Sequence, residues 1–276
     1  MLLVLDIGNS NIVAGVFDGA KLAHSWRFAT NTRKTSDEYA VLLEDFFKQA
    51  GLKPGAIKDA ILASVVPPLD GVLQDALWGL FKLKAMVVGH KLDLGLSVGL
   101  RNPDEVGADR LVNAVAAFHA YPGPLLVLDF GTATTVDAVS ADGVYLGGAI
   151  APGVAISMEA LFSRTARLPR IDMEPPDSPI GGGTLQALRS GIYYGTLGGT
   201  RELCARIGAE LKRRDGRTPK LIATGGLSHW LPAAELGITE VVPDLTLRGL
   251  YLIWKRNRRA RGGRPAPKPK AKGRRR

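Results

Sequence analysis

Two segments of the chain place an aspartate, one further residue and a glycine directly after an apolar run. The first is Asp6-Ile-Gly8 and the second is Asp129-Phe-Gly131. A glycine lets the backbone turn tightly, so that successive N–H groups can converge on an anion. An aspartate next to a phosphate requires a cation between the two negative groups. The paired motifs therefore predict a site for nucleotide phosphates and a metal ion, which is the chemistry of a phosphotransferase.

The two segments belong to an internal repeat. Leu2-Leu-Val-Leu-Asp6 is identical to Leu125-Leu-Val-Leu-Asp129, and a glycine follows at the same spacing in both. Each copy continues with small polar residues and then with a second apolar stretch, which predicts a β-hairpin. The offset of 123 residues between the copies is too long for a solenoid repeat. We therefore expect two homologous half-domains that face each other.

Helices and further strands are predicted between the hairpins. Thr35 and Glu38 form a capping box that should open a helix ending before Gly51. The other expected elements are a buried strand at 61–66, a helix with the apolar face Leu111, Val112, Val115 and Phe118, a long helix at 185–214 containing Gly191, Gly195, Gly198 and Gly199, a strand at 221–226 that enters a glycine turn, and a closing helix at 247–254.

The net charge of +10 comes from one end of the chain. Residues 255–276 contain 12 Lys or Arg and no acidic residue, whereas the remainder has 24 basic and 26 acidic residues. A segment of Pro, Gly, Lys and Arg buries too little apolar surface to fold, so it is predicted to be disordered. Its charge would suit nucleic acid or another acidic surface, and a solvated extension without a binding role is an equal alternative.

The remaining composition favours a cytoplasmic protein. The single cysteine, Cys204, lies in a helical pattern and is interpreted as a buried structural thiol. Residues 1–5 run into Asp6 without a basic segment and are predicted to form a strand rather than a signal peptide. No apolar run reaches the roughly 20 residues of a membrane helix.

The two hairpins and the later turn at Thr224-Gly-Gly226 resemble the actin-like superfamily of phosphotransferases. The resemblance implies an α/β protein with a duplicated ribonuclease-H-like fold, in which each of two lobes has a mixed β-sheet flanked by helices. The lobes would comprise residues 1–115 and 116–254, followed by the basic tail 255–276. In that superfamily, the hairpins contact the phosphates of ATP and the glycine turn lies against the adenosine.

Four segments narrow the resemblance to type III pantothenate kinase. They are Asp6-Ile-Gly-Asn-Ser-Asn11, Asn102-Pro-Asp-Glu-Val-Gly-Ala-Asp-Arg110, Asp129-Phe-Gly-Thr-Ala-Thr-Thr135 and Tyr145-Leu-Gly-Gly-Ala-Ile-Ala-Pro-Gly153. The family resemblance implies phosphorylation of pantothenate by ATP, the first step of coenzyme A synthesis. It also implies a homodimer with the substrate site near the interface, for which the glycine-rich helix is a candidate contact surface.

Gly107-Ala-Asp-Arg110 opens a predicted helix and carries two reactive groups. A carboxylate beside an alcohol can accept the proton lost as the alcohol attacks phosphorus. An adjacent guanidinium can pair with the substrate's carboxylate or hold its hydroxyl. Taken alone, Asp109 could simply stabilise a helix start and Arg110 could be a solvated charge. The family resemblance instead assigns Asp109 as the general base.

The resemblance assigns the other site residues as follows. Pantothenate would contact Gly107, Ala108, Asp109, Arg110, Thr184 and Leu100; ATP would contact Asp6, Ile7, Gly8, Asn9, Ser10, Asn11, Ile12, Val13 and Thr132; Asp6 would organise Mg²⁺ and Asp129 would bind K⁺ or NH₄⁺. From the residues alone, Thr184 could equally be the N-cap of the long helix.

Three positions depart from the family pattern, which usually has an aromatic residue at Leu100, often an acidic one at Arg101, and a polar one at Gly183. Two rival functions remain at this stage. A sugar kinase of the same superfamily would use another acceptor, and a non-catalytic regulator would have no need of a base at Asp109.

Overall fold

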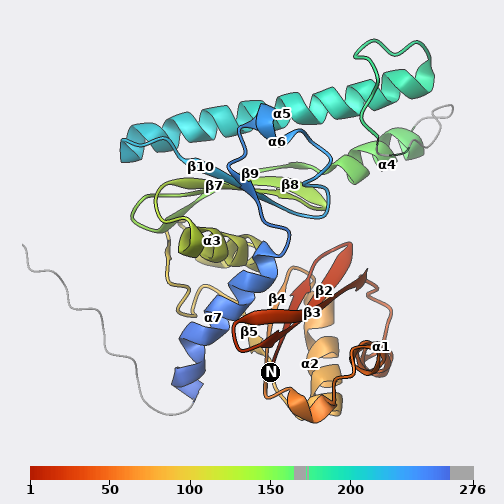
Figure 1. Ribbon diagram of the computed structural model, residues 1–276, viewed down its shortest axis with the longest axis vertical. Helices are drawn as coiled ribbons and strands as arrows, with labels where there is room; N and C mark the ends of the chain where they lie inside the picture. The colour runs from red at the N-terminus through yellow and green to blue at the C-terminus, as the bar shows by residue number, and fades with distance from the viewer. Residues whose placement is uncertain (165–171, 173, 262–276) are drawn as a thin grey trace, which may run out of the picture.

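The two repeats form two β-sheets, shown in Figure 1. The computed structural model describes residues 1–164, 172 and 174–261. The first sheet has the order β3-β2-β1-β4-β5 and the second has the order β11-β10-β7-β8-β9-β6. The strands are β1 (Leu2–Ile7), β2 (Asn11–Asp18), β3 (Lys21–Ala29), β4 (Asp59–Ser64), β5 (Met86–Val87), β6 (Ser97–Val98), β7 (Leu125–Phe130), β8 (Ala133–Val139), β9 (Val144–Pro152), β10 (Lys220–Thr224) and β11 (Glu240–Val241).

Strands β7 to β11 repeat the order and directions of β1 to β5. In each sheet the first three strands of the repeat are antiparallel, and the fourth and fifth run parallel to the first. Even the register irregularity recurs, between Val16 and Phe17 in one sheet and between Ala138 and Val139 in the other. The predicted duplicated α/β fold is therefore confirmed, with β6 as an added edge strand in the second sheet.

The helices cover both sheets and fill the space between them. They are α1 (Ser36–Gln49), α2 (Pro67–Phe81), α3 (Ala108–Ala120), α4 (Val154–Arg164), α5 (Thr184–Asp215), α6 (Ala233–Leu236) and α7 (Leu245–Arg261), with short 3₁₀ turns at Pro54–Ala56 and Pro103–Glu105. The predicted capping box is present at the start of α1, where Thr35 and Glu38 each accept a hydrogen bond from the other's backbone. The long helix α5 lies across the outer face of the second sheet (Figure 1).

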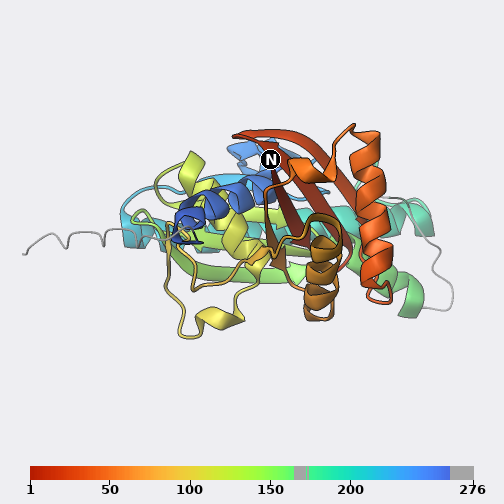
Figure 2. The same ribbon diagram turned by 90° about the horizontal axis from the view of Figure 1, so that it is seen from below.

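Helices α3 and α7 are packed between the sheets. Helices α1 and α2 cover one face of the first sheet, and α7 lies on the opposite face (Figure 2). One continuous core joins α3 and α7 to residues of both sheets, including Val4 and Val127. The helices cross where an added Cβ on Gly249 would be only 2.2 Å from the carbonyl oxygen of Val112. Gly249 therefore lets the two backbones approach closely.

The other predicted elements are confirmed with small shifts in their bounds. The buried strand is β4, the long helix is α5, the strand before the glycine turn is β10, and the N-terminal residues form β1. Cys204 is buried, as predicted for a structural thiol. No helix in the described part of the chain is long and apolar enough to cross a membrane.

The boundaries of the predicted lobes and tail need one correction. The sequence predicts disorder from residue 255, whereas α7 continues to Arg261. Contacts explain the added turns, because Asn257 hydrogen-bonds to Asp93 and the guanidinium of Arg258 lies 5.0 Å from the ring centre of Trp254. Residues 262–276 lie outside the described residues. The division at residue 115 falls inside α3 and stays a prediction.

The crossing of α3 and α7 can be tested with Gly249→Ala. The new methyl group would overlap the Val112 carbonyl, and such overpacking costs about 1–3 kcal/mol. We expect the free energy of unfolding, measured by urea denaturation, to fall by that amount. Gly208→Ala in α5 is the matched control, since its Cβ would make ordinary 3.6 Å contacts. Equal stability of the two variants would contradict the close crossing.

Candidate active site

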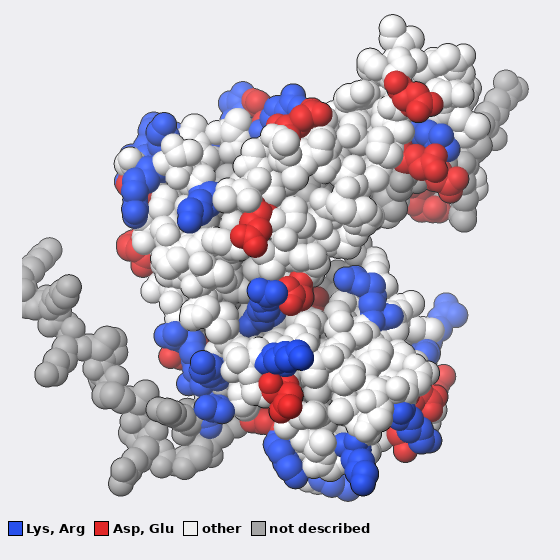
Figure 3. Space-filling model, in the orientation of Figure 1, with Lys and Arg blue, Asp and Glu red and all other residues white. Residues whose placement is uncertain are grey.

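The two hairpin turns of the repeat meet at the boundary between the lobes. The hydroxyl groups of Ser10 and Thr132 are 2.8 Å apart and form a hydrogen bond between residues from different lobes. Figure 3 shows a notch between the lobes on the right of the molecule, with basic side chains on its lower rim. The half-domains therefore face each other through their Asp-x-Gly turns, as the sequence predicted.

The glycine N–H groups of the two turns bond within the turns, whereas the sequence predicts that they face an anion. The N–H of Gly8 donates to Asn11 and the N–H of Gly131 donates to Ala133, so neither of these two groups is available to an anion. Neither glycine has a left-handed backbone. The second turn is also one residue shorter, because Asp6 pairs with Val13 whereas Asp129 pairs with Thr135.

Thr30 anchors the first turn from the end of β3. Its hydroxyl donates to the carbonyl of Gly8 at 2.6 Å, and its N–H donates to the carbonyl of Ser10 at 3.0 Å. In a trans peptide the N–H points opposite to the carbonyl. The N–H groups of Asn9 and Asn11 therefore point away from Thr30. These two amides, unlike the amide of Gly8, can donate to a phosphate.

Three carboxylates converge behind the turns. Asp6 is the last residue but one of β1, Asp129 holds the same place in β7, and Asp109 lies in the first turn of α3; all three are partly buried. The pKa is raised to about 8 for Asp6 and to about 7 for Asp129, chiefly by burial and in addition by repulsion from Asp109. The pKa of Asp109 is also raised, chiefly by burial. Three anions held this close favour a bound cation or proton.

Asp129 is held from two sides. Its Oδ2 accepts a hydrogen bond from the side-chain amide of Asn113 at 2.9 Å, and Asn113 accepts one from Thr246 of α7 at 2.8 Å. On the other side, Gly225 follows β10 with φ +97°, and a Cβ there would lie 2.4 Å from Oδ1 of Asp129. The predicted glycine turn thus packs directly against the second aspartate.

Asp109 is placed by the backbone around it. Its Oδ1 accepts the N–H of Arg110 at 2.8 Å, which satisfies one free donor of the helix start. A Cβ on Gly107 would lie 2.5 Å from the same oxygen, so only glycine leaves the carboxylate in this position. Asp109 therefore stabilises the start of α3, and it also lies close enough to Asp6 and Asp129 to affect their pKa values.

Arg110 is already paired with an acid that sequence reasoning missed. Its Nε and Nη2 donate to Oδ1 of Asp137 at 2.9 and 2.5 Å, and Asp137 also accepts the hydroxyls of Tyr145 and Thr135. Asp137 is buried, and burial outweighs these bonds to raise its pKa. Within the described residues, no hydrogen bond involves Nη1 of Arg110. That edge alone remains for a substrate.

Several predicted contacts need revision. The side chains of Ile7 and Ile12 are buried in the core against α1 and α2, so only their backbone atoms can face a nucleotide. Leu100 packs against Gly147 of β9, one residue from the position that pairs with Asp137. Thr184 is the first residue of α5 and not its N-cap, which is Gly183. The start of α5 lies beside α4, well away from α3 (Figure 1).

The carboxylates fit a divalent cation that also binds other ligands. No three His, Cys, Asp or Glu in the described part of the chain lie close enough to hold a metal by themselves. Mg²⁺ usually keeps several waters and binds through one or two carboxylates together with substrate phosphates. The raised pKa values of Asp6 and Asp129 are the observation that matches such an ion.

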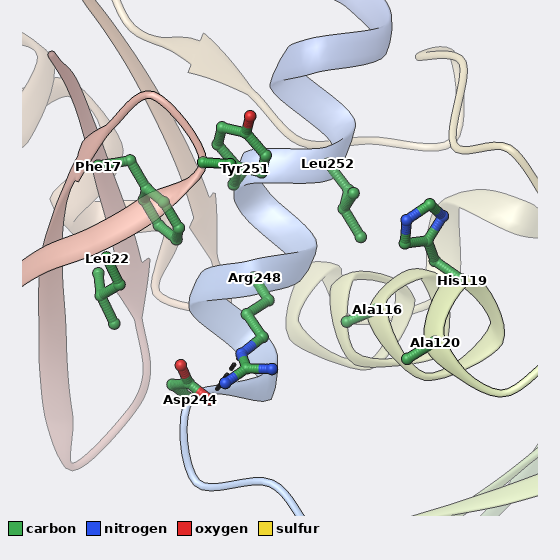
Figure 4. A pocket seen from close by; sticks show the side chains of 10 residues that line it. Phe17, Leu22, Ala116, His119, Ala120, Asp244, Arg248, Tyr251 and Leu252 are labelled. Atoms are coloured by element: carbon green, nitrogen blue, oxygen red, sulfur yellow. Dashed lines mark ion pairs between the residues drawn. The ribbon is translucent and has the colours of Figure 1, made fainter.

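A separate cavity of about 570 Å³ lies between the β2–β3 hairpin, α3 and α7, as Figure 4 shows. His119 and Ala120 line it at the end of α3, roughly 15 Å along the helix from Asp109. Asp244 and Arg248 form an ion pair of 2.8 Å at its wall. The cavity contains none of the predicted site residues and is not the place of the carboxylates.

Comparison with known proteins decides the family. The type III pantothenate kinase family model matches residues 2–206. The type III pantothenate kinase of Pelobacter propionicus is 48% identical over 258 residues, which cover 94% of this chain and 100% of that protein. The chain belongs to the type III pantothenate kinase family. It is a kinase, and it uses ATP.

Solved structures agree on the fold of this family member. One is a Campylobacter jejuni protein named for the Baf family of transcriptional activators, with a TM-score of 0.56, 20% identity and coverage of 93% of this chain and 99% of that one. Another is the activator of 2-hydroxyisocaproyl-CoA dehydratase from Clostridium difficile with bound ADPNP, with a TM-score of 0.52, 14% identity and coverage of 96% and 99%. At these identities the likeness concerns the fold alone.

The functional residues missed by sequence reasoning are Thr30, Asn113 and Asp137. Two of them carried a usable signal, since an amide on the apolar face of a helix and an acid inside an apolar strand both require buried partners. Thr30 had none, because its partners lie 20 or more residues away in the first turn.

The crowded carboxylates predict a distinct pH dependence of stability. With no cation bound, the folded-state pKa values of Asp6 and Asp129 lie above the ordinary value near 3.9, so the folded protein binds more protons than the unfolded chain. The free energy of unfolding should therefore fall as the pH rises from about 4 to about 8. Melting temperatures measured in EDTA would show this slope.

Asp6→Asn should flatten the slope in the same buffer series, because it removes one of the crowded charges. Asp18→Asn is the control, since Asp18 is exposed at the far end of β2. An unchanged slope in Asp6→Asn would contradict the electrostatic account of the site.

Proposed function

We propose that this enzyme transfers the γ-phosphoryl group of ATP to the hydroxyl of pantothenate, the first step of coenzyme A synthesis. The observation that carries the proposal is the place of Asp109, a carboxylate of raised pKa beside the acids of two phosphate-type turns. A base with a pKa nearer to neutrality accepts a proton more readily in the transition state. We also propose a cytoplasmic location, because ATP is available there.

In this proposal the two turns hold the nucleotide. The amides of Asn9 and Asn11 and the hydroxyls of Ser10 and Thr132 would donate to its phosphates. Asp6 would hold Mg²⁺ through its carboxylate or through bound water. Asp129, oriented by Asn113, would hold K⁺ or NH₄⁺. The cations would supply positive charge that offsets the repulsion between the phosphates and the acids.

Asp109 would act on the acceptor. The hydroxyl oxygen of pantothenate forms a bond to the γ-phosphorus while the bond from that phosphorus to the β–γ bridging oxygen breaks. The hydroxyl proton passes to the carboxylate of Asp109, and ADP carries away the electron pair of the broken bond. Gly107 supports this role, because it leaves the carboxylate in place.

Arg110 would bind the carboxylate of pantothenate through Nη1. Its other edge is fixed by Asp137, so the guanidinium is already oriented before the substrate arrives. Leu100 would contribute an apolar wall from its place against Gly147. Arg110 therefore cannot bind the substrate through its Nε and Nη2 edge, because Asp137 already accepts hydrogen bonds from both atoms.

A homodimer would complete the substrate site. Of nine large hydrophobic side chains that are exposed in the described residues, six lie between residues 150 and 194. They are Ile150, Ile156, Leu161, Ile180, Leu185 and Tyr194. A Cβ on Gly191 or Gly195 of α5 would meet no atom of the described residues within 4 Å, so this helix also offers room for a close partner. Thr184 lies at that surface and far from its own Asp109, so it would serve the site of a second copy.

Asp109→Asn tests the base. The amide keeps the shape of the side chain but cannot accept the proton, so we expect turnover to fall by about 10²-fold or more with little change in melting temperature. Release of ADP should be measured with and without pantothenate and K⁺. Retained pantothenate-dependent release in Asp109→Asn would refute the role of Asp109. Release with sugars in place of pantothenate would instead favour the rival sugar kinase.

Mixing two inactive variants tests the shared site. Thr184→Glu places a bulky negative charge where Thr184 is proposed to contact pantothenate, and a glutamate suits the first turn of a helix. If Thr184 serves the partner's site, exchange of subunits with Asp109→Asn would create dimers with one intact site. Activity should then return to about a quarter of the wild-type value, for random pairing in a symmetric dimer.

Light scattering should confirm the dimer, and capture of dimers that carry two different labels should confirm that subunits have exchanged. If activity does not recover although exchange has occurred, the shared site is contradicted. A fully active monomer would contradict the dimer itself.

A further inference from the structure

Arg27 is a basic residue of β3 that neither the family motifs nor the site described above uses. In the first sheet Asp6 pairs with Val13, and Val13 pairs with Arg27. Residues that pair across neighbouring strands direct their side chains to the same face of a sheet. Arg27 and Asp6 therefore share the face that is turned toward α7 and the second lobe, about 10 Å apart at their backbones.

The side chain of Arg27 reaches the other lobe. Its Nη1 lies 3.9 Å from the point that a Cβ on Gly226 would occupy, in the glycine turn after β10. Thr224, which begins that turn, pairs with Asp129. The guanidinium thus crosses the boundary between the lobes close to both Asp-x-Gly turns.

Arg27 has no fixed partner there. Within the described residues it makes no hydrogen bond and no ion pair, and it is exposed. Its charge nevertheless lowers the pKa of Asp6 and of Asp129, against the larger effects that raise them. A cation with free donors, facing two phosphate-type turns, matches an anion that enters the notch between them.

We propose that Arg27 binds the terminal phosphates of the nucleotide and so joins the two lobes across it. The proposal rests on the proposed function for the identity of the nucleotide. A planar guanidinium can donate two parallel hydrogen bonds to phosphate oxygens, which a lysine cannot reproduce. The contact would bring the glycine turn of the second lobe and β3 of the first lobe onto the same ligand.

Titration calorimetry with Mg²⁺ and a non-hydrolysable ATP analogue, and separately with AMP, tests this contact. We expect Arg27→Gln to weaken binding of the analogue by roughly tenfold or more, as for loss of a charge-assisted hydrogen bond. Binding of AMP should stay within about twofold, because AMP has no terminal phosphates. Arg27→Lys should recover part of the loss, since it restores the charge without the fork.

Lys21→Gln is the matched control, because it removes an exposed positive charge from the other end of β3. It should leave both affinities unchanged. Arg27→Gln with an unchanged affinity for the analogue would overturn the proposal, and so would equal weakening of the analogue and AMP. Failure of the wild-type enzyme to phosphorylate pantothenate would overturn the proposed function instead, and the nucleotide titrations would still be read.

Discussion

The close crossing of α3 and α7 is the constraint on which the site depends. These helices follow the last strand of each repeat, and each packs between the two sheets. Gly249 permits the approach to Val112, and a hydrogen bond from Thr246 to Asn113 links the helices within the site itself. Because Asp109 begins α3, the crossing fixes the distance from the proposed base to both Asp-x-Gly turns. A change in the helix pair would therefore alter the catalytic geometry as well as the stability.

The site concentrates carboxylates at the place where the negatively charged phosphates of ATP are proposed to bind. Asp6, Asp129 and Asp109 come from three different elements, and repulsion from Asp109 helps to raise the pKa of both Asp6 and Asp129. Asp137 and Arg110 form a separate, paired cluster alongside them. The unpaired acids suit cations that arrive with ATP, whereas the paired arginine suits a substrate that must be oriented. The same fold thus places three carboxylates without a salt-bridge partner among the described residues next to the Arg110–Asp137 ion pair.

Duplication explains why the two lobes share one strand arrangement, but it does not explain their different proposed roles. The repeats agree in strand order, direction and even the position of a register irregularity. They differ in the length of the turn by one residue and in the helix that follows the third strand, which is α1 in one lobe and α4 with the much longer α5 in the other. The exposed apolar residues gather on that longer addition, so the second lobe carries the surface that we propose for dimerisation.

The sequence by itself determined the duplicated fold, the family and the two aspartates near the ends of β1 and β7, because these depend on local patterns. Apolar runs, capping residues and Asp-x-Gly turns act over a few residues and can be recognised without tertiary contacts. Only the tertiary structure decided that the glycine N–H groups close their own turns, that Arg110 is already paired with Asp137, and that Arg27 reaches the second lobe. Those facts depend on partners between 2 and about 200 residues away, and on which face of a sheet or helix each side chain occupies. The tail shows the same limit, since its first residues continue α7, where Asn257 hydrogen-bonds to Asp93, 164 residues away in the chain.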